Sequence, residues 1–359
     1  MSEGINLLIC SLIILPWPWL RQRYFGQKNI SEQLPIKNRI AFFDFIKGLA
    51  ILAVIFIHVG YFNVFFPIAQ PQLFFLYLTN NIARFAIPIF LICSGILLNP
   101  LTDSRQIKEF YTRKIWRIFL PYGLCTLAYA LYFSSNVPEF FYNLISGRAV
   151  LPYYFIIVLI ALYLLYPLLD KLRSEKYFLP ACFAISLVSY FIPQIRAVYG
   201  TPLFLEFLFF FAYGLVSRQR FLNYQKDKQE ACLWLATILF YLAIILIRPG
   251  YYYNTQLFYG LAIFNLLFYC QKMLTRNKFI FKLVSAFGKN SLWVYLLHFP
   301  LVYLSYILIS GLAVNYYLQF LAVFISSVIL AGVAAKIIQL GYQYIVKDLL
   351  NINATRNYA

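Results

Sequence analysis

The sequence predicts an all-α membrane protein, a polytopic bundle of about ten transmembrane helices. The first observation behind this prediction is composition: 62% of the 359 residues are hydrophobic and only 12% are charged, with a mean hydropathy of +0.73. A water-soluble domain has about a quarter of its residues charged. The second observation is a succession of long apolar runs, and the third is that Lys and Arg concentrate in alternate connections between those runs.

The apolar runs define the predicted spans, because a helix needs roughly 20 mostly apolar residues to cross a bilayer. They occupy residues 41–66, 73–98, 116–134, 152–169, 178–193, 200–217, 231–247, 255–270, 291–310 and 316–340. We expect one membrane domain over residues 38–345, between an N-terminal hydrophobic and basic extension (1–37) and a cytoplasmic tail (346–359). Residues 5–20 are short for a span and fit either an interfacial anchor or an extra short helix. They lack the features of a cleaved signal peptide.

The positive charge predicts the orientation of the bundle. Most of the 30 Lys and Arg lie before the first span, between spans two and three, and after spans four, six, eight and ten. The opposite connections carry Arg148, Arg196 and Arg248. The positive-inside rule therefore places both ends of the ten-helix core in the cytoplasm, with the protein in the cytoplasmic (inner) cell membrane. The net charge of +18 is thus an orientation signal, and no nucleic-acid partner is expected.

Ionisable side chains within the spans are the candidate functional groups, because each costs roughly 2.5–3.5 kcal/mol to insert into a membrane. Asp44 and Lys47 are three residues apart, so they share a helix face and can pair. His58 follows on nearly the same face, about 16 Å further along the axis. Each group also has a structural interpretation: snorkelling for Lys47, packing for His58, and ion pairing for Asp44, Arg84 and Glu206.

His298 is the second of the two histidines in the chain, and it lies about two turns into span nine. In straight helices its depth should differ from that of His58 by about 12–15 Å. We therefore expect that the two imidazoles do not share a proton. His298 would instead orient a helix or line the path of a donor substrate through the bundle. The six cysteines stand singly in apolar segments, which is typical of packing residues, and no metal site is expected.

Two further segments carry polar signals. In the second span, Arg84 is followed by Pro88, which interrupts the helical hydrogen bonds, and by Ser94 and Gly95, which permit close helix packing. The basic segment TRKIWRIFLPY precedes the third span. It either anchors that helix at the cytoplasmic surface or holds a phosphate-rich molecule.

These motifs together resemble acyltransferase family 3, the multi-span membrane acyltransferases that modify cell-envelope glycans, lipids and small molecules. Lys47 and His58 match the family's pattern of Arg or Lys, ten residues and His, and RFAIPIFLICSG matches its second-span signature. The basic segment, PYYFIIVLIALYLLYPLL and GKNSLWVYLLHFP match in the same order. Span four departs from the family, because it carries Tyr153 and Tyr154 where many members have a His.

The resemblance implies a transferase of acyl groups other than aminoacyl groups, most often acetyl, although succinyl and longer groups occur in the family. It implies acetyl-CoA or another acyl-CoA as the cytoplasmic donor, an envelope polysaccharide or lipid-linked saccharide as the acceptor, and no permanently bound cofactor. His58 would act as a general base or carry the acyl group itself, and both routes stay open. The implied site residues are His58 and Asp44 for catalysis, Lys47, Arg84, Arg113 and Arg117 for donor binding, and Ser94, Glu206 and His298 as further candidates.

The alternative to an enzyme is a secondary transporter or exporter of a glycan or small molecule, since a charged stripe through a helix bundle also suits transport. Transporters often show inverted repeats, and the chain shows no such internal symmetry. The enzyme is therefore the leading prediction. The sequence carries no indication of the oligomeric state.

Overall fold

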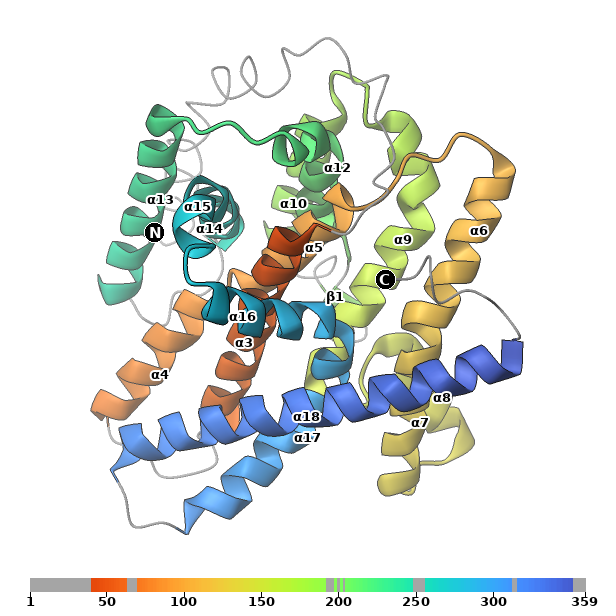
Figure 1. The fold of residues 1–359 in the computed structure, drawn as a ribbon, viewed down its shortest axis with the longest axis vertical. Coiled ribbons are helices and arrows are strands. Elements are labelled where there is room, and N and C mark those ends of the chain that lie inside the picture. Colours follow the sequence, from red (N-terminus) through yellow and green to blue (C-terminus); the bar gives the residue numbers. More distant parts are fainter. Residues whose placement is uncertain are drawn as a thin grey trace.

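The computed structural model describes residues 40–62, 70–191, 197–198, 201–202, 204–247, 256–311 and 315–350. The predicted N-terminal extension, with its apolar run 5–20, and residues 351–359 of the predicted tail lie outside these ranges. The described chain is a helical bundle (Figure 1). Two residue pairs, β1 (Ala197–Val198) and β2 (Thr201–Pro202), form a short antiparallel hairpin beside it.

Six helical stretches of the described chain are long and apolar enough to cross a membrane: Ala41–Tyr61, Pro71–Ile96, Leu151–Leu172, Lys228–Ile247, Ser291–Ser310 and Tyr316–Ile345. They coincide with six of the predicted spans, so the membrane protein is confirmed. The other four predicted spans hold shorter helices, which are α7 (Leu120–Tyr132), α10 (Phe178–Phe191), α12 (Leu208–Leu222) and α14 (Gln256–Tyr269). The predicted count of about ten spans is therefore not confirmed.

The reason for this difference is that the prediction treated each apolar run as one regular helix. In two of the four shorter segments the helix changes type. A π-helical turn, η2 (Ile115–Phe119), precedes α7, and a 3-10 turn, η4 (Phe204–Phe207), precedes α12. An apolar composition does not reveal such changes, because the hydropathy of a residue is the same in either kind of helix.

Helix α3 (Ala41–Phe62) lies at the centre of the bundle. It packs against five elements, namely α4 (Gln70–Ala83), α5 (Ala86–Ile96), α16 (Lys278–Lys289), α17 (Ser291–Ser310) and α18 (Tyr316–Leu350). The contact with α16 depends on two glycines. A Cβ atom on Gly288 would stand 1.7 Å from the Asp44 carbonyl oxygen, and one on Gly48 would stand 2.0 Å from that of Val284. Only glycine allows the two backbones to approach this closely.

The second predicted span is broken into α4 and α5, and the sequence explains the break. Pro88 has no N–H group to donate to the carbonyl of Arg84, so a regular helix cannot continue through this point. The predicted close packing near Gly95 is also confirmed. A Cβ on Gly95 would lie 2.4 Å from the Phe211 carbonyl oxygen of α12, and one on Gly214 would lie 2.3 Å from that of Ile92.

The remaining helices complete the bundle and lie largely at its edges. They are α6 (Ser104–Lys114), α8 (Val137–Ser146), η3 (Leu151–Tyr153), α9 (Tyr154–Leu172), α13 (Lys228–Ile247) and α15 (Gln271–Leu274). Helix α6 begins where the Asp103 side chain accepts a hydrogen bond from the Gln106 backbone N–H, 2.8 Å away. In Figure 1, α6, α7 and α8 follow one another along one side of the molecule.

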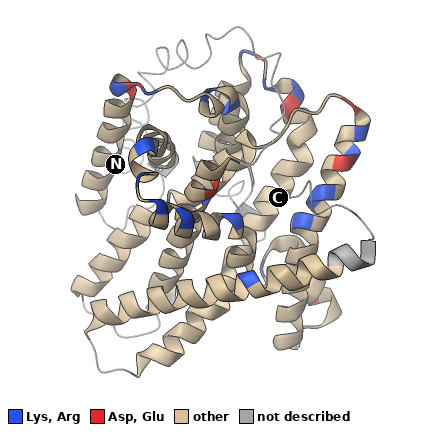
Figure 2. Ribbon diagram, in the orientation of Figure 1, with Lys and Arg blue, Asp and Glu red and all other residues tan. Residues whose placement is uncertain are grey.

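Positive charge is distributed unevenly over the bundle. Figure 2 shows Lys and Arg on α6, on α16, at the end of α9 and around the start of α13, in the upper and middle parts of the view. The lower ends of α4 and α17 carry no charged side chain among the described residues. The structure thus has one basic region and one nearly uncharged end, which is the asymmetry expected of a membrane protein with a preferred orientation.

Candidate active site

The basic end of the site begins with the ion pair at the start of α3. Lys47 Nζ lies 3.1 Å from Asp44 Oδ1, so the predicted pairing is confirmed. The Asp44 side chain is 2% exposed and that of Lys47 is 22% exposed. Asp44 is buried because Gly288 brings α16 directly against the backbone of this turn. The ammonium group of Lys47 therefore faces a partly accessible region while its carboxylate partner is held inside.

Lys114, the last residue of α6, brings a second cation to this end. Its Nζ lies 3.8 Å from the centroid of the Tyr163 ring of α9, a cation–π arrangement. Burial, and then the positive charges of Arg117, Arg113 and Lys47, lower the pKa of Lys114 to about 7. We call Lys47, Arg113, Lys114 and Arg117 the cationic cluster. It joins the predicted donor residues of α3 to those of α6 and η2.

Ser94 lies beside the same tyrosine. The side chains of Ser94 and Arg117 both interact with the Tyr163 hydroxyl. The neighbouring residue, Cys93, lies within electrostatic range of both Lys47 and Asp44. The C-terminal end of α5 is therefore level with the ion pair of α3, and Ser94 belongs to the surroundings of the cationic cluster.

Arg84 lies elsewhere. It sits at the break between α4 and α5, nine residues before Cys93, which corresponds to about 14 Å along a helix. Its near neighbours include Tyr241 of α13, and the Tyr259 hydroxyl donates to the adjacent Ile82 carbonyl at 2.8 Å. The structure thus separates Arg84 from the cationic cluster, although the sequence grouped it with Lys47. Its depth is closer to that of the histidines.

The two histidines meet, contrary to the sequence prediction. The His58 and His298 ring centroids are 5.1 Å apart, and the Phe299 ring packs edge-on against His58 at 5.5 Å. His298 is fully buried, whereas His58 is partly exposed. The predicted depth difference assumed straight helices that start at one level. Helix α16 lies against the first turns of α3, and Figure 1 shows α17 starting below the start of α3.

The segment of α17 that carries His298 is tied to η3 by two reciprocal bonds. Pro300 has no N–H for the Leu296 carbonyl, and the Tyr153 hydroxyl donates to that carbonyl at 2.8 Å. In return, the Tyr295 hydroxyl donates to the Pro152 carbonyl. Tyr153, one of the two tyrosines at which the sequence departs from the family, thus holds the backbone next to His298.

Glu206 is buried, with 5% of its surface exposed. It lies in η4, at the turn that leads into α12, and not inside a regular span as the sequence had suggested. The Ser186 side chain of α10 fixes this turn, because it donates to the Leu205 carbonyl at 2.8 Å and accepts from the Phe209 N–H at 3.0 Å. Glu206 is therefore anchored at the start of α12.

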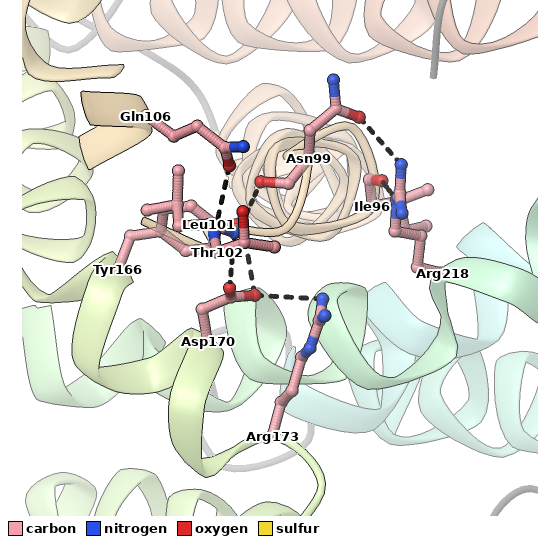
Figure 3. Close-up of polar contacts among 9 residues, drawn as sticks. All are labelled: Ile96, Asn99, Leu101, Thr102, Gln106, Tyr166, Asp170, Arg173 and Arg218. Atoms are coloured by element: carbon pink, nitrogen blue, oxygen red, sulfur yellow. Dashed lines mark hydrogen bonds and ion pairs between the residues drawn. The ribbon is translucent and has the colours of Figure 1, made fainter. Parts of the chain in front are cut away.

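A buried arginine at the end of α5 was missed by the sequence reasoning. Arg218 was counted among the loop cations after span six, but it lies in α12 and is 0% exposed. Its Nε donates to the Ile96 carbonyl at 3.1 Å, and its Nη2 donates to Asn99 Oδ1 at 2.9 Å (Figure 3). The guanidinium thereby satisfies a carbonyl at the C-terminus of α5, where the helix has no donors of its own.

Asp170 of α9 holds the loop that follows α5. Its carboxylate accepts the Leu101 N–H at 2.9 Å and pairs with Arg173 at 3.0 Å (Figure 3). The Tyr166 hydroxyl donates to the Asn99 carbonyl at 2.6 Å. These contacts connect α5, α9 and α12 around the helix end that carries Ser94. The hydropathy pattern could not find them, because they join residues about 70 to 120 positions apart in the sequence.

The fold and these side chains define a polytopic membrane protein with ionisable groups at two depths of one helix, the Asp44–Lys47 pair and His58. The family of the chain follows from its sequence. A family model described as an acyltransferase domain, acyltransferase family 3, matches residues 40–336. The chain therefore belongs to acyltransferase family 3, as the motifs had indicated. No curated protein and no solved structure matches the chain.

Proposed function

We propose that this protein is a membrane O-acyltransferase that moves an acyl group, most often acetyl, from acyl-CoA to a hydroxyl of an envelope polysaccharide or lipid-linked glycan. The observation that carries the proposal is the arrangement along α3. The cationic cluster gathers around Lys47, and the two histidines meet about 16 Å further along the helix. One end suits a polyanion, and the other supplies imidazole chemistry.

The cationic cluster suits the head of coenzyme A, which carries several phosphate groups. Arginine binds phosphate in a bidentate manner, and lysine binds it as a compact charge. Arg113 and Arg117 are exposed, and Lys47 is partly exposed, so all three can be reached from outside the bundle. The acyl end of the donor would then extend along α3 toward His58. Arg84, which is nearer that depth, would contact the acyl group or the acceptor in preference to the phosphates.

His58 has two chemical routes to the ester. In the direct route, its ring nitrogen takes the hydroxyl proton while the hydroxyl oxygen bonds to the thioester carbonyl carbon. The C–S bond breaks, and the thiolate of coenzyme A receives the proton. In the second route, the His58 nitrogen bonds to the thioester carbonyl carbon, the C–S bond breaks and the thiolate leaves. The hydroxyl oxygen then bonds to the acyl carbon, the bond to His58 breaks, and the hydroxyl proton goes to the thiolate. Both routes give one ester and one free thiol.

The test is transfer by the purified protein in nanodiscs, with radiolabelled acetyl-CoA and an envelope glycan fraction as acceptor. We expect label in the glycan with the wild type, and loss of transfer with retained acetyl-CoA binding in His58→Ala. Lys47→Ala should weaken acetyl-CoA binding more than acceptor binding. No transfer to any glycan fraction, together with substrate flux in proteoliposomes, would identify a transporter. Normal turnover by His58→Ala would remove His58 from the site but leave the enzyme class intact.

A further inference from the structure

We propose that His298 is a positioning residue that accepts a hydrogen bond from the Nδ1–H group of His58, and so leaves Nε2 of His58 as the nitrogen that takes the acceptor proton or the acyl group. This inference rests on the proposed function for its chemistry, because it assigns the working atom of His58. The pairing itself rests on geometry alone. Its test therefore does not depend on transfer activity.

The tautomer of the neutral His298 ring follows from its contacts. Its Nδ1 lies 2.6 Å from the Tyr295 carbonyl oxygen. A carbonyl oxygen only accepts, so Nδ1 must carry the hydrogen, and Nε2 of the neutral ring is then an acceptor. This Nε2 atom is buried and has no hydrogen-bond partner in the part of the chain that the structure describes. His298 thus presents a fixed lone pair inside the protein.

His58 offers the matching group. Its Nδ1 is likewise buried and without a hydrogen-bond partner among the described residues. The two ring centroids are 5.1 Å apart with an interplanar angle of 47°, a separation at which a nitrogen of one ring can reach a nitrogen of the other within hydrogen-bond distance once the two face each other. Buried polar atoms are normally paired, which favours this bond over two orphaned nitrogens. His58 as a whole residue is partly exposed, which suits a group that must be reached by a substrate.

The structure also holds His298 in place. The reciprocal bonds from Tyr153 to the Leu296 carbonyl and from Tyr295 to the Pro152 carbonyl fix the turn of α17 that carries it. An acceptor that cannot move selects one tautomer of its partner, and in the same way metal-bound histidines are oriented by a fixed acceptor on the other nitrogen. When His58 gains a proton on Nε2, its Nδ1–H stays bonded to His298, and Nε2 later passes the gained proton to the thiolate of coenzyme A.

The experiment uses the fact that the chain has only two histidines. Full-length protein with nitrogen-labelled histidine, purified without a polyhistidine tag, gives the Nδ1 and Nε2 signals of only two imidazole rings in nitrogen NMR. We expect His58 to carry its hydrogen on Nδ1 in the wild type. His298→Phe removes the acceptor and should move the hydrogen of His58 to Nε2, whereas His298→Gln keeps an acceptor oxygen and should retain the wild-type tautomer.

The wild-type spectrum alone can overturn the pairing: a neutral His58 with its hydrogen on Nε2 excludes the bond, even if a variant fails to fold. An unchanged His58 signal in a folded His298→Phe variant does the same. In transfer assays, His298→Phe should lower kcat on the order of 100-fold with little change in the KM for acetyl-CoA, and His298→Gln should recover part of it. A paired His58 in a protein that transfers no acyl group would refute the function and leave the pair standing.

Discussion

Among the lysines that the structure describes, Lys114 lies in an environment unlike that of an exposed lysine. Its amine lies over the Tyr163 ring, and the charged groups that surround it are Lys47 from α3 and Arg113 and Arg117 from its own segment. A pKa of about 7 means that the empty site holds this amine partly neutral near physiological pH. Binding of a polyanion favours the protonated form, so donor binding and proton uptake should be coupled.

The coupling predicts how donor affinity depends on pH. Above pH 7 the amine of the empty site has lost its proton, so binding must recover one, and affinity for a non-hydrolysable acetyl-CoA analogue should fall by up to about tenfold per pH unit. Phosphate groups, with a second pKa near 6, change little in this range. Lys114→Arg stays charged and should bind with a flatter pH profile. Calorimetry between about pH 7 and 9 measures the affinity of the wild type and of Lys114→Arg for the analogue. Equal slopes of affinity against pH in the two proteins would contradict the coupling.

At the scale of single residues, the sequence predicted which side chains belong to the candidate site, but it did not always predict which of them are in contact. The Asp44–Lys47 pair was predictable because helical spacing alone brings the two together. The meeting of His58 and His298 was not predictable, because it depends on where α17 starts, and α16 sets that level. Arg218 was wrongly predicted to be a loop cation. The sequence pattern of a basic residue at the end of an apolar run is the same whether the side chain faces water or donates to the end of a neighbouring helix.

Among the elements, α16 has the largest influence on the site. It is a basic amphipathic helix that packs against the first turns of α3 through Gly48 and Gly288, and it leads directly into α17. The hydropathy pattern treated this stretch as a loop, because it is too short and too charged to be a span. The break at Pro88 and the packing at Gly95 were predictable, since each follows from the chemistry of one residue type.

The α3–α16 contact should be intolerant of any side chain at Gly288. A methyl group there would overlap the Asp44 carbonyl, so Gly288→Ala must push the helices apart and should destabilise the protein by about 1–3 kcal/mol. Thermal unfolding in detergent measures this effect. Gly341→Ala in α18 is the matched control, because the added Cβ would have no described atom within 4 Å apart from the neighbouring backbone of its own helix. Equal stability of the two variants would show that the helices do not pack as described.

For the whole molecule, composition was sufficient to predict a helical membrane protein, and the family match supports the same class. The predicted count of about ten spans is not confirmed, because four of the apolar runs hold shorter α-helices than the six long stretches do. The uneven distribution of Lys and Arg along the sequence is also seen in the structure, which has a basic region over α6 and α16 and a nearly uncharged end (Figure 2). This asymmetry is the basis for expecting donor and acceptor on opposite sides of the membrane.

The most direct test of the account is the direction of acyl transfer across a sealed membrane. Proteoliposomes with known protein orientation would receive labelled acetyl-CoA only on the side that exposes the cationic cluster, with a glycan acceptor enclosed on the other side. We predict labelled glycan inside the vesicles, and no product when donor and acceptor exchange sides. Product that forms only where donor and acceptor share one side would contradict a transfer route along α3 from the cationic cluster to the histidine pair.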